Sequence, residues 1–155
     1  MIDVQAMPFI ADIPRVQSER RADETAFWFE GQSTSFGELE TRSNQVANGL
    51  IGHGVEPGDR VAYLAKNTDV YYEMLFGCAK ARAVMTGVNT RLAAPEIQFI
   101  LADSKARILF VGKEFYSIID QIRDDLPDLM RVITIDGDRE DWDYFPIPNP
   151  PRHRA

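Results

Sequence analysis

The amino-acid sequence predicts an α/β fold built on a mainly parallel sheet with flanking helices. Between Gly58 and Val111, two segments of helical period separate three short apolar runs, which are Val61–Ala65, Ala83–Val88 and Ile108–Val111. Strands that alternate with helices in this way form parallel sheets with right-handed crossovers. With 155 residues, of which 45% are hydrophobic, the chain is long enough for one domain with a buried core.

Composition narrows the class of protein. The formal net charge is −7 and the sequence pI is about 4.8, which argues against nucleic acid or an anionic membrane as the main partner. The single cysteine, Cys78, cannot form an internal disulfide, and this favours a reducing compartment. The N-terminus lacks the basic and apolar regions of a secretory signal, and no apolar run approaches the ~20 residues that span a bilayer. We therefore expect a cytoplasmic protein without a transmembrane segment.

The first part of the chain is predicted to contain a short helix and a small hairpin. Residues 1–24 form an N-terminal arm, in which Asp12 and Pro14 suit the start of a helix that runs through Arg21. Strand-forming residues follow, and a Glu-Gly-Gln turn within 26–35 separates them from a second short strand.

The longest helix is predicted to begin after Ser35. Ser35 and Glu38 have the spacing of a capping box, in which each side chain accepts a hydrogen bond from the main-chain amide of the other residue. Gly52 and Gly54 end this helix, because glycine adopts the left-handed conformation at low cost. Apolar residues at helical spacing form one stripe along it: Phe36, Leu39, Val46, Ala47, Leu50 and Ile51.

The central segment begins with a buried strand, Arg60–Ala65, which shows little polar alternation. Asn67 is expected to cap the next helix. The inner face of that helix is predicted to carry Val70, Tyr71, Met74, Leu75, Cys78 and Ala79. Cys78 lies in this apolar stripe with only Lys80 and Arg82 as nearby cations, so we interpret it as a small buried hydrophobic residue rather than a nucleophile.

The remaining strands follow the same pattern. Pro95 begins a helix that leads into the strand Ala106–Val111. A helix over 115–126 repeats apolar residues at three-four spacing, and a fourth strand is expected at Arg131–Asp136. The segment 137–155 is acidic and then rich in proline and arginine, which predicts an extended or disordered tail. The α/β domain thus covers residues 25–136.

Two residues are candidates for a polar contact with a ligand. Asn89 and Arg91 lie in the loop after the second strand of the parallel sheet, and ligands of open α/β sheets gather at the carboxyl ends of strands. The alternative is that Asn89 braces the loop with its side-chain amide while Arg91 covers the surface. The sequence has no GxxxxGK[ST] loop, GxGxxG turn or GxSxG elbow, and two histidines with one cysteine do not make a common zinc site. We therefore assign no catalytic, cofactor-binding or metal-binding residue.

Several short motifs carry a family resemblance over about residues 22–137. SFGEL at Ser35–Leu39 resembles the pattern [T/S]-Y-x-E-L, with Phe36 in place of the tyrosine, and GVEPGDRVA follows at Gly54–Ala62. The segment from Gly77 to Val111 matches G-x-x-K-x-G-A-V-x-x-P-x-N-x-R-L, with the E-I and I-L-x-D-S that come after it. Through these motifs the chain resembles the N-terminal portion of the adenylate-forming acyl-CoA synthetases. Its NTRLAAPEI run is most similar to fatty-acid and related carboxylate–CoA ligases.

The chain departs from the family pattern at two positions. Arg82 stands where glycine is usual, and Gly87 stands where proline is usual, so backbone geometry is expected to differ at the ends of the second strand. The resemblance also implies that the chain stops before the family's phosphate-binding TSGTTGxPKG loop, its YGxTE segment and its C-terminal lysine. No catalytic position of the family can be carried over.

The resemblance implies that these residues are the N-terminal fragment of an ATP-dependent carboxylate–CoA ligase with a fatty acid as substrate. The intact enzyme would use ATP, magnesium and CoA to form an acyl-adenylate and then an acyl-CoA thioester. The fragment alone is expected to bind no cofactor and to be inactive. A second hypothesis is a stand-alone binding or regulatory module that pairs with an intact ligase or with itself through exposed surface. A third, a flavodoxin-like nucleotide binder, rests on the fold alone.

Overall fold

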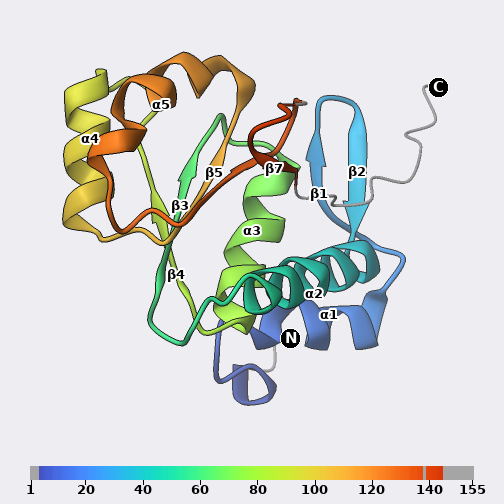
Figure 1. The fold of residues 1–155 in the computed structure, drawn as a ribbon. Helices are drawn as coiled ribbons and strands as arrows, with labels where there is room; N and C mark the ends of the chain where they lie inside the picture. The colour runs from blue at the N-terminus through green and yellow to red at the C-terminus, as the bar shows by residue number, and fades with distance from the viewer. Residues whose placement is uncertain (1–3, 138, 145–155) are drawn as a thin grey trace.

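The structure is a computed structural model that describes residues 4–137 and 139–144 (Figure 1). Three short 3-10 helices accompany the main elements: η1 (Val4–Ala6), η2 (Lys113–Phe115) and η3 (Arg123–Asp125). The helices and strands are α1 (Asp12–Arg21), β1 (Thr25–Phe29), β2 (Gln32–Ser35), α2 (Phe36–Gly52), β3 (Arg60–Leu64), α3 (Asp69–Lys80), β4 (Val84–Gly87), α4 (Ala94–Asp103), β5 (Ile108–Val111), α5 (Tyr116–Ile122), β6 (Arg131–Thr134) and β7 (Asp143–Tyr144).

The predicted α/β fold with a mainly parallel sheet is confirmed. Among the described residues, five strands lie in the order β4-β3-β5-β6-β7, and every neighbouring pair is parallel. Val61 of β3 is aligned with Met85 of β4 on one side and with Ile108 of β5 on the other. Because β4 and β5 lie on opposite sides of β3, the chain changes direction across the sheet at this strand.

Helices cover both faces of the sheet, α2 and α3 on one side and α4 and α5 on the other (Figure 1). Strand side chains alternate between the two faces. Tyr63 and Phe110 pack in the core cluster that contains Leu50 of α2 and Met74 of α3. The opposite face has its own cluster, which joins alternate strand residues to α4 and α5: Ala62, Leu64, Leu109, Val111, Ile97, Leu101, Ile119 and Ile122.

The predicted capping box fixes the start of α2. Ser35 Oγ accepts a hydrogen bond from the Glu38 amide at 3.2 Å, and Glu38 Oε2 accepts one from the Ser35 amide at 2.8 Å. At the other end the helix stops at Gly52, and Gly54 adopts a φ of +81°. The sequence therefore determines both ends of this helix through local hydrogen bonding and backbone freedom.

Two helix predictions were wrong in detail. The side chain of Thr68, and not that of Asn67, caps α3 by accepting a hydrogen bond from the Val70 amide at 3.2 Å. The segment 115–126 is not one helix, because α5 covers only its centre and 3-10 turns lie on either side. Its apolar spacing still describes burial correctly: Phe115, Ile119, Ile122 and Leu126 are all buried.

Residues 139–144, which the sequence assigns to an extended or disordered tail, include the short strand β7. β7 pairs with β6, with Asp143 aligned to Ile133, and Trp142 is buried. The Arg139 guanidinium carbon lies 3.9 Å from the centroid of a Trp142 ring. A single buried aromatic residue thus anchors a segment whose overall composition is polar. The prediction for residues 145–155 concerns a part of the chain outside the described residues.

Arg82 has a backbone conformation that favours glycine, with a φ of +59°. A residue with a Cβ adopts this left-handed conformation at a cost of about 1 kcal/mol. Arg82 therefore strains the backbone between α3 and β4. We expect Arg82→Gly to raise the free energy of unfolding by up to about 1 kcal/mol, less the added entropy of the unfolded chain. Urea unfolding measures this change. Arg82→Ala is the matched control, because it removes the guanidinium and keeps the strain, and equal stabilisation by both variants would contradict the prediction.

Candidate functional site

The carboxyl edge of the parallel sheet is the first candidate site. Ligands of such sheets bind beyond the carboxyl ends of the strands, where the direction of the chain across the sheet reverses. In this chain the reversal lies between β3 and β5. Polar residues follow each of the four longer strands at this edge: Lys66 after β3, Asn89 and Arg91 after β4, Lys113 and Glu114 after β5, and Asp136 after β6.

The structure places the two predicted candidates, Asn89 and Arg91, in one exposed loop. Asn89 Oδ1 accepts a hydrogen bond from the Arg91 amide at 2.9 Å. The side-chain amide therefore braces the loop, which is the structural alternative that the sequence left open. A contact of either residue with a ligand stays a prediction.

Residues of the chain itself interact with one another at the ends of β3 and β5. Lys66 Nζ lies 2.9 Å from Glu114 Oε1, and this hydrogen bond raises the pKa of Lys66 and lowers the pKa of Glu114. Both groups are largely exposed to solvent, so the pair contributes little to stability. At Gly112, an added Cβ would lie 3.1 Å from Ala65 Cβ, which shows how closely the two loops approach. The Lys113 amide donates to Asp136 Oδ1 at 2.8 Å.

Two buried titratable groups of the core, one near each end of the strands, are held in their neutral forms. Burial raises the pKa of Tyr63 to about 12, and its hydroxyl donates to the Lys66 carbonyl at 3.2 Å. Burial likewise raises the pKa of the Cys78 thiol to about 12, as its predicted place in the apolar stripe of α3 implies. A phenol and a thiol with such values are neither bases nor nucleophiles near neutral pH.

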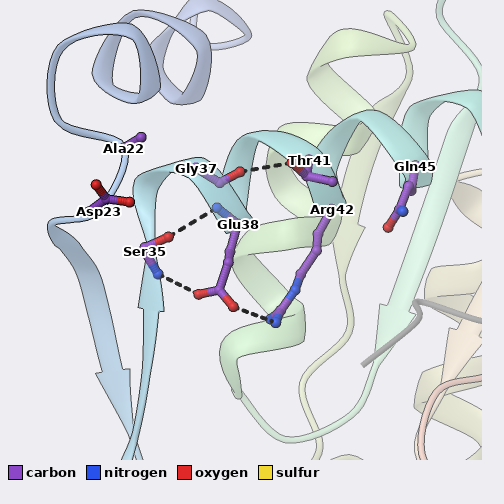
Figure 2. A pocket seen from close by; sticks show the side chains of 8 residues that line it. All are labelled: Ala22, Asp23, Ser35, Gly37, Glu38, Thr41, Arg42 and Gln45. Atoms are coloured by element: carbon purple, nitrogen blue, oxygen red, sulfur yellow. Dashed lines mark hydrogen bonds and ion pairs between the residues drawn. The ribbon is translucent and has the colours of Figure 1, made fainter. Parts of the chain in front are cut away.

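A second candidate is a pocket of about 360 Å³ beside the start of α2 (Figure 2). Its walls come from the link between α1 and β1 and from one side of α2: Ala22, Asp23, Ser35, Gly37, Glu38, Thr41, Arg42 and Gln45. Figure 2 shows the Glu38 carboxylate between the Ser35 amide and the Arg42 guanidinium. Arg42 Nη2 donates to Glu38 Oε1 at 3.3 Å, which adds an ion pair to the capping box.

Arg42 also joins α2 to α3. Its Nη1 donates to Glu73 Oε1 at 2.9 Å, and the side chains of Arg42 and Glu73 are only 10% and 1% exposed. The Arg42 guanidinium, which lines the pocket, therefore lies between the carboxylates of Glu38 and Glu73 and joins α2 to α3. The sequence showed the capping box, but it gave no signal for a pair of residues that lie 31 positions apart.

Two groups at the sheet edge that could bind a phosphate already bind acidic side chains of this chain. At the sheet edge, the Lys66 ammonium is neutralised by Glu114 and the Lys113 amide is occupied by Asp136, whereas a triphosphate needs several amides and cations directed at it. In the described part of the chain, no three acidic, histidine or cysteine side chains are grouped so that they could hold a metal ion. We assign no catalytic step to these residues.

Comparison with known proteins gives a consistent picture. The family described as "AMP-binding enzyme" matches residues 14–151. A fatty acid–[acyl-carrier-protein] ligase of Streptomyces coeruleorubidus is 46% identical over 93 residues, which are 60% of this chain and 18% of that protein. A 4-hydroxybenzoate–CoA/benzoate–CoA ligase of Rhodopseudomonas palustris is 32% identical over 123 residues, which are 79% of this chain and 23% of that protein.

A solved ligase structure has the same fold as this chain. The crystal structure of an anthranilate CoA ligase in complex with anthranoyl-AMP superimposes with a TM-score of 0.84 at 32% identity, over 93% of this chain and 29% of that chain. No helix in the described ranges, 4–137 and 139–144, has both the length and the apolar character to cross a membrane. The chain spans less than a third of each of these relatives, and over that region it belongs to the AMP-binding enzyme family.

Proposed function

We propose that this chain is part of an ATP-dependent ligase that joins a carboxylic acid to CoA. The match of the family to residues 14–151 carries the proposal, because it covers the whole parallel sheet from β3 to β7. The relatives on both the sequence and the structure side are named as carboxylate ligases. In the complete enzyme, ATP, magnesium and CoA would serve the formation of an acyl-adenylate and then of a thioester.

We propose a fatty acid as the substrate class. The support is the NTRLAAPEI run and the 46% identity to a ligase named for a fatty acid. Aromatic acids are the second candidate, because a feruloyl-CoA synthase of Amycolatopsis is 47% identical over 85 residues. The edge residues Asn89 and Arg91 are the proposed polar contacts of this region in the complete enzyme.

We propose further that the 155 residues are inactive by themselves. Adenylation requires groups that orient the phosphates and stabilise the charge that develops on them. Two cations of these regions are instead engaged with carboxylates: Lys66 at the sheet edge with Glu114, and Arg42 in the α2 pocket with Glu73. The region would therefore act as a scaffold for chemistry performed elsewhere.

A segment exchange tests the ligase assignment. Residues 14–136 replace the corresponding segment of the Rhodopseudomonas benzoate ligase, and ATP–pyrophosphate exchange is measured with benzoate and with a fatty acid. We expect a folded chimera that retains exchange, with activity shifted toward the fatty acid if this region selects the substrate. A chimera that melts cooperatively, as the parent does, but shows no exchange with either acid would contradict the assignment.

A further inference from the structure

β4 ends the parallel sheet and leaves one of its edges open. β3 is its sole neighbour in the sheet that the described residues form. The Val84 amide donates to the Asp59 carbonyl at 2.8 Å, and the Val88 amide donates to the Tyr63 carbonyl at 2.9 Å. Since main-chain groups alternate in direction along a strand, the amides and carbonyls of Met85 and Gly87 point away from β3.

This edge is short, but it lacks the charged residues and the proline that oppose pairing with another strand. The sequence of β4, Val-Met-Thr-Gly, contains no charge and no proline, and charged residues, prolines and bulges are the usual protection of an edge. Val84 is 50% exposed. No atom lies within 4 Å of the position that a Cβ on Gly87 would occupy, so a side chain at this position has room on its face of the sheet. Glycine at 87 supplies an amide where proline would supply none.

We propose that the outer edge of β4 pairs with the same edge of a second copy of this chain. The edge is complementary to itself in antiparallel orientation about a two-fold axis at Thr86. Thr86 then lies opposite its own counterpart, and Met85 of each copy lies opposite Gly87 of the other. Both of these residues direct their amides and carbonyls outward, so they form the hydrogen-bonded pairs of an antiparallel ladder.

Charge does not oppose this register. Arg82 of one copy lies opposite Thr90 of the other, so no two like charges are directly opposed.

The strand has only four residues, however, and so short a contact does not reach the roughly 1,200 Å² of a stable complex. We therefore expect weak association, with a dissociation constant on the order of 0.1–1 mM. The inference is independent of the ligase assignment, since it uses only the geometry of β4.

Sedimentation velocity of the complete 155-residue chain, from about 10 µM to 1 mM, measures the association that this affinity implies. Gly87→Pro removes the outward amide, and we expect it to raise the dissociation constant at least about tenfold. Gly87→Ala is the matched control, because it keeps the amide and has room for its Cβ, and it should associate like the parent. If Gly87→Pro does not melt cooperatively, Val84→Lys replaces it, since a charge at this exposed position opposes pairing.

Amide NMR spectra recorded over the same concentrations locate the contact. We expect shifts at Met85 and Gly87 that grow with concentration and are absent from the proline variant. A parent that stays monomeric at about 1 mM would overturn the proposal. So would equal association of the proline variant, or shifts confined to another exposed apolar surface such as Phe9 and Ile10.

Discussion

Replacing Arg42 with methionine is expected to lower the free energy of unfolding by about 3–5 kcal/mol. The guanidinium lies 2.9 Å from Glu73 Oε1, and both side chains are nearly inaccessible to water. Removal of Arg42 takes a charged partner away from the buried Glu73 carboxylate, in a region of low dielectric constant where water does not compensate the loss. The effect is large because Arg42 also bonds Glu38 at the start of α2.

A double-mutant cycle measured by urea unfolding tests this account. Arg42→Met, Glu73→Met and the double variant are compared, and the double variant should lose less stability than the sum of the two single losses. Arg15→Met is the control, since Arg15 forms ion pairs with Asp12 and Glu19 at an exposed surface and should change stability little. Additive losses in the cycle would show that Arg42 and Glu73 are not energetically coupled.

Gly77→Ala is expected to destabilise the fold by about 1–3 kcal/mol, although alanine favours helices more than glycine does. Gly77 lies where α3 contacts α2, and an added Cβ would be 2.5 Å from Val46 Cβ and 3.2 Å from the Ser43 carbonyl. Neither atom is the end of a flexible side chain, so the two helices would have to separate. Val46 is fully buried, which makes that separation costly.

Gly52→Ala is the matched control for this prediction. It lies at the end of α2, where nothing is within 4 Å of an added Cβ, and we expect it to leave stability unchanged or slightly higher. Thermal or urea unfolding compares the two variants. A Gly77→Ala variant as stable as the parent would show that α2 and α3 are not in close contact at this point.

The fold was predictable where local chemistry and spacing act together. The apolar runs of β3 and β5 predicted the parallel sheet, and the Ser35–Glu38 spacing predicted the start of α2. The predicted cap of α3 was wrong because two neighbouring residues could both accept the capping hydrogen bond. Asn67 and Thr68 are both good caps, and the choice between them depends on the backbone geometry at the end of β3.

The candidate sites were less predictable because they depend on contacts between distant parts of the chain. Arg42 and Glu73 look like ordinary surface residues of two amphipathic helices until the packing of α2 on α3 buries them. In the same way, the polar segment around Trp142 becomes ordered only by contacts such as that between Trp142 and Tyr116, whose ring centroids are 5.0 Å apart. Asn89 could be assigned a bracing role from its type and position, and the structure shows that bond.

The central claim is that these residues provide a ligase scaffold without its chemistry. ATP–pyrophosphate exchange by the purified 155-residue chain, with fatty and aromatic acids supplied in turn, tests the claim most directly. We predict no exchange above a blank for any acid, from a chain that melts cooperatively. Exchange that depends on an added acid, and that persists through repurification, would contradict the account and show that this chain contains an adenylation site.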